Sequence, residues 1–294
     1  MAGRGLSFPV LPAGLSRLPD AAATAWADSL PGAAAACAET WGLRLGRVLS
    51  VGHVSVAIGA TTRDGAPAVL KMQMPELFAN HEAAALQIWG GRGAVRLIAH
   101  DPERGGLLLE RCLPGKPISG SAKEVVGAMV GLLARLWVPA GAPFRNVSAL
   151  VSDWTAGAPG ARGLPEAELP RRLLDAALDL LPSLARSQGD MALCHHDLHR
   201  RNVLTATREP YLAIDPKPLV GEREFAAAEI VDLIELGHSR RAVLWRLDMV
   251  CDMLALDRER TRAWGASLPV AWQLNFPPRP EHIEMAQWLL SARP

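Results

Sequence analysis

His195-His196-Asp197-Leu198-His199-Arg200-Arg201-Asn202 is the stretch that decides the fold of this chain of 294 residues. Within it, an aspartate precedes an asparagine by five positions. A second aspartate, Asp215, ends the apolar run 211–214, and a shorter apolar run, 203–205, follows the asparagine. Two such runs on either side of Arg208-Glu209-Pro210 predict a short β-hairpin. The sequence therefore links two carboxylates and one amide through a compact segment.

This pattern matches the H-x-D-L-x-x-x-N loop of kinases. Phosphoryl transfer asks little covalent chemistry of a protein, because its main needs are positioned reactants and neutralised charge. Asp197 is the candidate catalytic residue, since an aspartate here takes or orients the proton of the acceptor hydroxyl. Asn202 and Asp215 are the candidate ligands of Mg²⁺, which prefers oxygen ligands.

The N-terminal part of the chain predicts strands followed by a helix. Strand-like segments cover 47–52, 54–60 and 66–71, with a turn at Arg63-Asp64-Gly65, and a helix is expected over 75–89. The third strand ends on Lys71. In kinases a lysine at this place pairs with the nucleotide phosphates and with a glutamate of the next helix.

Glu82 is the candidate for that glutamate. The loop that would cover the phosphates is less distinct, because it has one glycine, Gly52. Its backbone amides and the hydroxyl of Ser55 could reach phosphates. An ordinary hairpin turn explains these two residues almost as well.

The chain is predicted to form two lobes of α+β class. Further strands are expected at 94–98 and 106–109, and Leu113-Pro114-Gly115 breaks the pattern. We place the boundary there, between an N-terminal nucleotide-binding lobe, 1–112, and a catalytic and acceptor-binding lobe, 113–294. The first lobe begins with a helical extension that reaches about Cys37. In the second lobe, only the short hairpin should interrupt the helices. Those helices are expected over 122–137, 166–184, 225–236 and 241–256.

Composition excludes several classes of protein. Hydrophobic residues make up 49% of the chain and its formal net charge is +1, so it can bury a large core and lacks the charge excess of a nucleic-acid-binding protein. No apolar run reaches the length of about 18 residues that a membrane span needs. The four cysteines are scattered and form no C-x-x-C pair, which argues against disulfides or zinc. We expect a soluble, cytoplasmic protein.

Several stretches resemble the aminoglycoside phosphotransferase family, in particular its streptomycin 6-kinase and hydroxyurea phosphotransferase branch. The most specific is Ala213-Ile214-Asp215-Pro216-Lys217-Pro218-Leu219-Val220-Gly221-Glu222, which is very similar to the family's I-D-P-K-x-L-V-G stretch around its metal aspartate. Residues 68–71 and 81–86 look like the family's nucleotide lysine strand and the helix of its paired glutamate. Residues 107–111 look like the hinge after the adenine, which makes Glu110 a candidate for cofactor binding.

The resemblance implies a bilobal protein-kinase-like fold, with an N-terminal antiparallel sheet and a helix, and a larger, mainly helical C-terminal lobe. It implies ATP with Mg²⁺ as cofactors and a small polar molecule as the acceptor of the phosphate. An aminoglycoside such as streptomycin, inactivated by the transfer, is the first expectation. Nothing in the sequence points to an obligate protein partner.

The chain departs from the family pattern at three positions. The family usually has glycine where His196 stands, and Arg201 occupies a position that is often small, which could narrow the acceptor site. Phe225 is followed by Ala226, whereas the family tends to have an aspartate there that supports the catalytic loop. Either Glu224 or Glu229 could substitute for it. The chain also has no A-P-E sequence after Asp215, so the activation segment of a protein kinase is absent.

The sequence leaves the acceptor and two alternative functions open. Carboxylates that could bind a cationic acceptor alternate with arginines, so a solvated surface of mixed charge explains them equally well. They are Glu222, Glu229, Asp232, Glu235, Asp248 and Asp252. One alternative is a kinase-like nucleotide-binding protein with little turnover. The other is a metal-dependent phosphohydrolase built on the adjacent His196 and Asp197.

Overall fold

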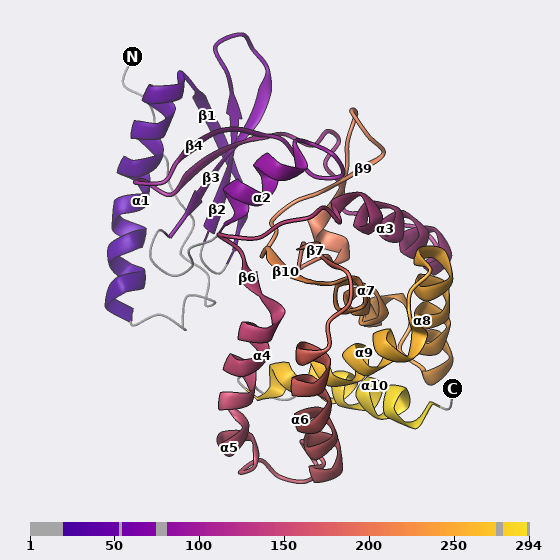
Figure 1. Ribbon diagram of the computed structural model, residues 1–294. Coiled ribbons are helices and arrows are strands. Elements are labelled where there is room, and N and C mark those ends of the chain that lie inside the picture. The colour runs from indigo at the N-terminus through magenta and orange to yellow at the C-terminus, as the bar shows by residue number, and fades with distance from the viewer. Residues whose placement is uncertain (1–19, 53–54, 75–80, 275–278, 293–294) are drawn as a thin grey trace. The chain divides into compact units, whose positions relative to one another are not determined.

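The computed structural model describes residues 20–52, 55–74, 81–274 and 279–292 (Figure 1). The chain divides into two compact units, Met1–Gly115 and Lys116–Pro294, close to the boundary placed after residue 112. Each unit has a hydrophobic cluster of its own. None of the described helices has both the length and the apolar character needed to cross a membrane.

The N-terminal unit contains one antiparallel sheet of five strands in the order β1-β2-β3-β5-β4. Its strands are β1 (Arg44–Val51), β2 (Ser55–Thr61), β3 (Pro67–Gln73), β4 (Leu97–Asp101) and β5 (Gly106–Glu110). The fourth strand was expected at 94–98, and this was wrong by three residues. Asp101 still pairs with Gly106 in the ladder, so the strand runs further and the turn is shorter than the sequence suggested.

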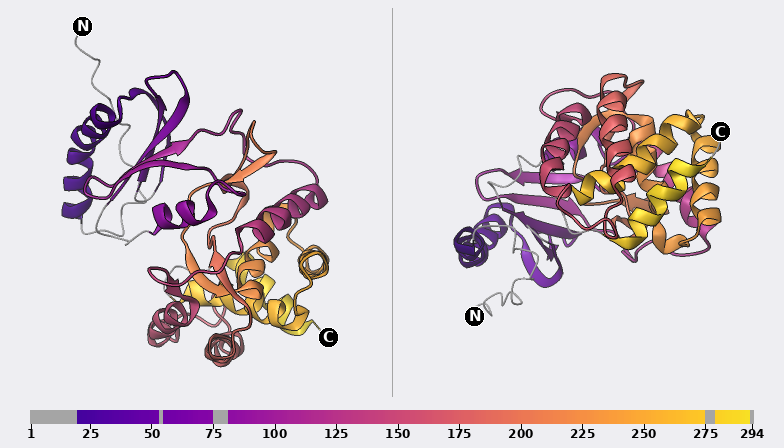
Figure 2. Two further views of the ribbon diagram at one scale, coloured as in Figure 1. Left: turned by 45° about the horizontal axis from the view of Figure 1, so that its top comes forward. Right: turned by 90° about the horizontal axis from the view of Figure 1, so that it is seen from below.

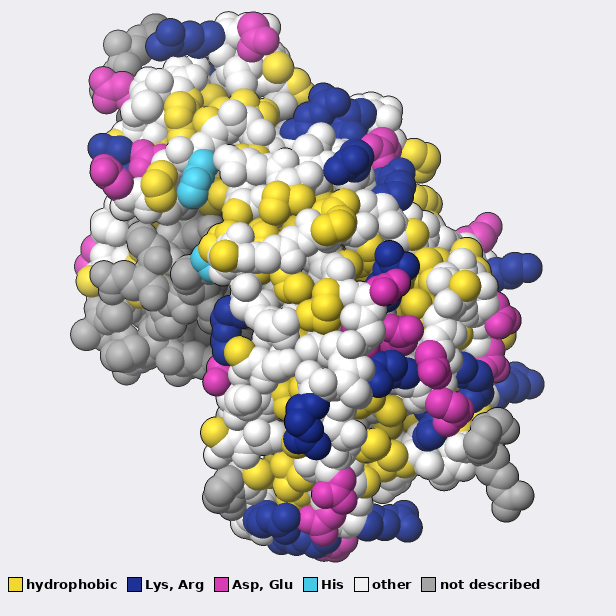
Figure 3. Space-filling model, in the orientation of Figure 1, with side chains coloured by type: hydrophobic (Ala, Val, Ile, Leu, Met, Phe, Trp, Pro, Cys, Tyr) yellow, Lys and Arg dark blue, Asp and Glu magenta, His cyan; other side chains and the backbone are white. Residues whose placement is uncertain are grey.

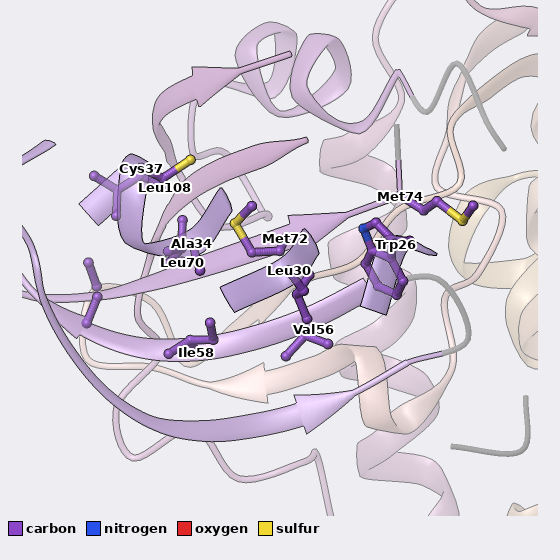
Figure 4. Packing of buried hydrophobic residues seen from close by; sticks show 12 residues of the cluster. Trp26, Leu30, Ala34, Cys37, Val56, Ile58, Leu70, Met72, Met74 and Leu108 are labelled. Carbon is purple, nitrogen blue, oxygen red and sulfur yellow. The ribbon is translucent and has the colours of Figure 1, made fainter. Parts of the chain in front are cut away.

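Helix α1 (Asp20–Trp41) packs its apolar stripe on this sheet (Figure 4). Trp26, Leu30 and Ala34 recur at the spacing of one helix face, and all three are buried against strand residues such as Ile58 and Leu70. The helix approaches β5 closely at Gly106, where a Cβ atom would lie 2.7 Å from the sulfur of Cys37. A second helix, α2 (Glu82–Trp89), follows β3. The predicted start of that helix, 75–80, lies outside the described residues.

The C-terminal unit is mainly helical. Its helices are α3 (Ala122–Leu136), α4 (Val147–Ala156), α5 (Ala158–Ala161), α6 (Arg171–Arg186), α7 (Arg223–Val231), α8 (Arg240–Leu254), α9 (Arg258–Gln273) and α10 (Pro280–Ser291). Helix α9 packs against α6, α7 and α10 and so lies at the centre of the bundle (Figure 2). Acidic and basic side chains are interspersed over the face of these helices that Figure 3 shows, as expected for a solvated surface of mixed charge.

Two small sheets interrupt the helices of this unit. The predicted hairpin is present as β8 (Val203–Thr205) and β9 (Tyr211–Ala213). A three-stranded sheet was missed, so the expectation that the hairpin alone breaks the helical run was wrong. Its strands are β6 (Arg145–Asn146), β10 (Leu219–Glu222) and β7 (Met191–Cys194). Strand β7 leads directly into His195 and β10 follows the Asp215 stretch, so this sheet fixes both ends of the motif.

Two predicted helix boundaries were also wrong. Helix α6 begins at Arg171 and not at Glu166, because Pro170 disfavours helical backbone in the residue before it. Helix α7 ends at Val231 and not at Leu236. The guanidinium of the buried Arg246 donates to the carbonyl oxygens of Val231 and Gly237, both at 2.9 Å, and so stabilises the interruption.

Glu222, one of the carboxylates considered for acceptor binding, is instead an internal link between elements. Its side chain is fully buried and accepts hydrogen bonds from the Gly189 amide at 2.8 Å, from Nε of Arg260 at 2.6 Å and from Nε1 of Trp264. Because this carboxylate is buried, Glu222 is excluded from the candidates for acceptor binding. The carboxylate connects the end of β10 to α9.

We expect Glu222→Ala to lower the free energy of unfolding by about 3–5 kcal/mol, because it leaves the partly buried Arg260 without its counter-charge. Glu222→Gln keeps the side-chain shape and should lower the free energy of unfolding by a smaller amount. Asp248→Ala is the matched control, since Asp248 forms an exposed pair with Arg258 at 2.7 Å, of a kind worth about 0–1 kcal/mol. Urea denaturation measures all three. Equal small losses for Glu222→Ala and Asp248→Ala would contradict this account.

Candidate active site

The predicted catalytic loop lies between β7 and β8. After Cys194 the chain runs through Asp197 into a short 3-10 turn, Arg200–Asn202, before β8 begins. The side-chain amide of Asn202 donates to the backbone oxygen of Asp197 at 2.9 Å and to its Oδ2 at 3.3 Å. The structure thus brings together the two polar residues that the motif places five positions apart.

His195 joins this loop to the segment that carries Asp215. Its Nε2 lies 3.0 Å from the carbonyl oxygen of Ile214, and its own carbonyl accepts from the Lys217 amide at 2.8 Å. The Ile214 amide in turn donates to the carbonyl of Asn202 at 2.9 Å. Burial lowers the pKa of His195, although the charges of Glu229, Asp197 and Asp215 oppose that shift. A neutral imidazole with its proton on Nε2 satisfies the contact to Ile214.

Asn202 and Asp215 form a donor set that fits Mg²⁺. Because the nitrogen of the Asn202 amide is the donor to Asp197, the other atom of that amide is an oxygen acceptor. The backbone of Asp215 has a φ of +56°, in the left-handed region that aspartate tolerates better than most residues. A carboxylate and an amide oxygen are hard ligands of the type that Mg²⁺ takes from proteins.

Lys217 is a site residue that sequence reasoning missed as a functional group. Its ammonium lies 2.7 Å from Oδ2 of Asp197, while Nε2 of His199 lies 3.7 Å from Oδ1. The sequence does place Lys217 two positions after Asp215, in the family-like stretch. That spacing alone does not show which carboxylate the lysine contacts. The candidate catalytic carboxylate therefore has a cation on one oxygen and a histidine near the other.

Glu229, on α7, contacts the catalytic loop in place of the family's aspartate, which Ala226 replaces. The sequence left both Glu224 and Glu229 open for this role. Its Oε2 accepts from the Leu198 amide at 3.2 Å, and its Oε1 lies 3.0 Å from Nδ1 of His196. Glu224 accepts instead from the Asp257 amide, at 3.4 Å. Although Ala226 lacks a carboxylate, the loop is still held by one from the same helix.

A cavity of about 690 Å³ opens beside the loop, entirely within the C-terminal unit. Asp197 and Arg201 line it, together with three carboxylates of or just beyond α7. These are Glu229, Asp232 and Glu235. Asp248 and Asp252, also considered for acceptor binding, do not line this cavity.

Another part of the cavity lining combines an acid, a base and an aromatic ring. Asp232 lies with its Oδ1 3.2 Å from Nδ1 of His282, and burial raises the pKa of the Asp232 carboxyl. Trp272 and Arg279 complete this side. The cavity therefore offers polar groups of both signs and an apolar surface beside the candidate catalytic carboxylate.

In the N-terminal unit, the structure brings Lys71 and Glu82 together. The ammonium of Lys71, on β3, lies 2.6 Å from Oε2 of Glu82 at the start of α2, and both side chains are buried. Gln73, which the sequence did not single out, donates to the same oxygen at 2.5 Å. This is the ion pair expected from the kinase pattern.

The remaining cofactor candidates have partners within the sheet. The Gly52 amide donates to the carbonyl of Ser55 at 2.8 Å. The two residues between them lie outside the described ranges. Glu110, at the end of β5, exchanges hydrogen bonds with the backbone of Arg96 through its amide and its carboxylate, at 2.9 and 3.0 Å. For Gly52, this contact favours the alternative of an ordinary turn.

Comparison with known proteins decides the family. Residues 41–273 match the family model described as aminoglycoside/hydroxyurea antibiotic resistance kinase. The chain belongs to this family. It is 39% identical over 249 residues to a hydroxyurea phosphotransferase of Kitasatospora aureofaciens, covering 83% of this chain and 72% of that protein. It is 37% identical over 250 residues to a streptomycin 6-kinase of Streptomyces griseus, covering 82% of this chain and 80% of that protein.

Solved structures place the fold among the kinases as well. One is a thermostable mutant of aminoglycoside phosphotransferase APH(4)-Ia in a ternary complex with ADP and hygromycin B. It matches with a TM-score of 0.54 at 13% identity, over 86% of this chain and 93% of that one. The protein-kinase-like fold predicted from the sequence is confirmed. The chain is a kinase of the aminoglycoside phosphotransferase type, so the phosphohydrolase alternative was wrong.

Proposed function

We propose that this kinase transfers the γ-phosphoryl group of ATP to a hydroxyl of a small polar molecule, and that an aminoglycoside such as streptomycin is the acceptor that it inactivates. The observation that supports this best is the place of Asp197. Its carboxylate lines a cavity of about 690 Å³, within the range of about 300–1,000 Å³ that is usual for small-molecule sites.

In the proposed mechanism, the acceptor hydroxyl lies in the cavity against Asp197, which takes its proton as the new bond from oxygen to the γ-phosphorus forms. The bond from that phosphorus to the oxygen it shares with the β-phosphate breaks, and ADP leaves. Asn202 keeps the Asp197 carboxylate in place through contacts to its backbone oxygen and Oδ2. Lys217 places a positive charge next to Oδ2, near the negative charge of the transferred group. Asn202 and Asp215 would hold Mg²⁺, which neutralises phosphate charge when bound.

The N-terminal unit supplies the nucleotide contacts in this proposal. Lys71 binds the α- and β-phosphates, and Glu82 fixes its ammonium by the contact of 2.6 Å. The hydroxyl of Ser55 is the further candidate for a phosphate contact, whereas the Gly52 amide already donates to the Ser55 carbonyl. The segment that ends at Glu110 follows the adenine. The alternative of a binding protein with little turnover loses its main support, because Glu229 compensates for the missing aspartate at Ala226.

The two relatives described above are named for acceptors of very different size, and the cavity favours the larger. Hydroxyurea would fill only a small part of the volume beside Asp197, whereas an aminoglycoside could contact both the loop and the wall formed by Asp232 and Trp272. A cationic acceptor would also find carboxylates there. Hydroxyurea remains the second candidate, because the relative at 39% identity is named for it.

An ATP-consumption assay with streptomycin and hydroxyurea as separate acceptors tests this choice. We expect kcat/KM for streptomycin to exceed that for hydroxyurea by at least about tenfold, a difference of roughly 1.4 kcal/mol in transition-state binding. Mass spectrometry must show one added phosphate on the acceptor. A higher kcat/KM for hydroxyurea would overturn the aminoglycoside assignment, and no phosphorylated product with any hydroxyl acceptor would overturn the proposed function.

A further inference from the structure

The catalytic loop contains a strained residue directly before Asp197. His196 has a φ of +55°, in the left-handed region where a side chain other than that of glycine is disfavoured. Such a conformation persists only where surrounding contacts determine it. The contacts of the imidazole should therefore explain why a side chain is present at this position.

The ring of His196 is held on two sides by α7. Its Nδ1 lies 3.0 Å from Oε1 of Glu229, and its plane stacks on the ring of Phe225 with centroids 5.3 Å apart. The side chains of His196 and Glu229 are only 15% and 9% exposed. Since water competes little there, the contact between them fixes the geometry more firmly than an exposed pair would.

The same carboxylate also holds the residue after Asp197. Oε2 of Glu229 accepts the Leu198 amide at 3.2 Å, while Oε1 meets His196. One side chain thus holds the chain on both sides of the catalytic aspartate. It comes from a buried helix that packs against α9, so its own position is fixed by the core of the unit.

We propose that Glu229 is a positioning residue for Asp197 and that His196 acts with it as one unit. The imidazole at position 196 gives the carboxylate a second point of attachment, and that attachment offsets the strain of the loop. This inference rests on the proposed function, because it concerns the orientation of the carboxylate that accepts the proton.

Variants of Glu229 and His196 test the proposal, with streptomycin or hydroxyurea as acceptor, whichever is turned over. We expect Glu229→Ala to lower kcat about 100-fold, as for a small misplacement of a catalytic group, and to change the KM for ATP by less than about threefold. Glu229→Gln keeps an oxygen for the Leu198 amide and should retain kcat within about tenfold. Glu224→Ala is the matched control, on the same helix but bonded to Asp257, and should retain the parent kcat.

A double-mutant cycle tests whether the two residues act as one unit. His196→Gly relieves the strain but removes the imidazole, so it should lower kcat less than Glu229→Ala does. The double variant should be no slower than Glu229→Ala alone, because the shared contact is lost only once. Independent, multiplicative effects would overturn the paired role.

Several results would overturn the positioning role itself. If Glu229→Ala lowers only the melting temperature, with kcat of the folded protein unchanged, the residue is merely structural. If it raises the KM for the acceptor and leaves kcat unchanged, Glu229 binds the acceptor. If Asp197→Ala abolishes turnover while Glu229→Ala does not affect it, only this inference fails. If Asp197→Ala is fully active, the assignment of Asp197 as the catalytic residue is wrong and this inference fails with it. If the parent protein phosphorylates no acceptor, the proposed function fails.

Amide hydrogen exchange gives a readout that does not depend on turnover. Glu229→Ala should accelerate exchange across residues 195–202, because it removes the acceptor of the Leu198 amide. Glu224→Ala should not. Unchanged exchange in Glu229→Ala would overturn the proposal even in a preparation without activity.

Discussion

Asp197→Ala should lower kcat by about 10²–10⁴-fold, the usual contribution of a positioned general base, with little change in the affinity for ATP. The carboxylate lines the acceptor cavity, and the contacts at its Oδ2 from Lys217 and Asn202 orient it. Removing it takes away the proposed proton acceptor and leaves intact the proposed nucleotide contact, Lys71, with its partner Glu82. Single-turnover kinetics and ATP titration calorimetry measure the two quantities separately.

Two further variants test whether the loss of kcat is specific to the carboxylate of Asp197. Asp197→Asn keeps the size of the side chain but accepts a proton far less readily, so it should be nearly as slow as the alanine variant. Asp190→Asn alters another carboxylate of the same unit, one that is 85% exposed and only weakly paired with Arg223, and should leave kcat unchanged. Full turnover in Asp197→Ala would show that the assignment of the catalytic residue is wrong.

Much of the site could be predicted because its key groups are local in sequence. Lys71 and Glu82 are separated by one strand end and the start of the next helix, and their pairing follows once both elements are recognised. Asp197 and Asn202 lie on one loop. The hairpin that follows, formed by two strands of three residues each, connects this loop to Asp215. Short-range spacing is thus sufficient to name these residues.

The parts that could not be predicted depend on contacts between distant segments. Strands β7 and β10 have four residues each, too few for a periodic signal, and the catalytic loop and the hairpin lie between them in the sequence. The end of α7 depends on the side chain of Arg246, which belongs to the next helix. Sequence patterns do not encode such partners.

The same reason explains the contacts missed around Asp197. The choice between Glu224 and Glu229 depends on which side of α7 faces the loop, and the contact of Lys217 depends on how the chain turns after Asp215. Glu222 looked like a surface carboxylate in sequence, yet the packing of Trp264 and Arg260 encloses it. Charge alone did not distinguish a buried acid from an exposed one.

Asp215→Asn should impair both binding and catalysis, in contrast to the variants of Asp197. The Ile214 amide bonds to the Asn202 carbonyl, so Asp215 lies beside the other proposed magnesium ligand. As a metal ligand, a carboxylate at this position would contribute charge that an amide cannot supply. Since metal ions provide several kcal/mol of charge stabilisation, we expect kcat/KM for ATP to fall on the order of 10³-fold.

Asparagine, and not alanine, is chosen at position 215 so that loss of the metal contact is measured without added backbone strain. Position 215 has a φ of +56°, which asparagine tolerates about as well as aspartate, whereas alanine would add strain of its own. Calorimetry should show that EDTA weakens ATP binding to the parent but hardly affects binding to Asp215→Asn, which is already weak. If Asp215→Asn binds ATP as tightly as the parent and EDTA weakens both equally, Asp215 is not a metal ligand. Mg²⁺ would then have to be held by other oxygens, and the role of the family-like stretch 213–222 would be to shape the loop through His195 and Lys217.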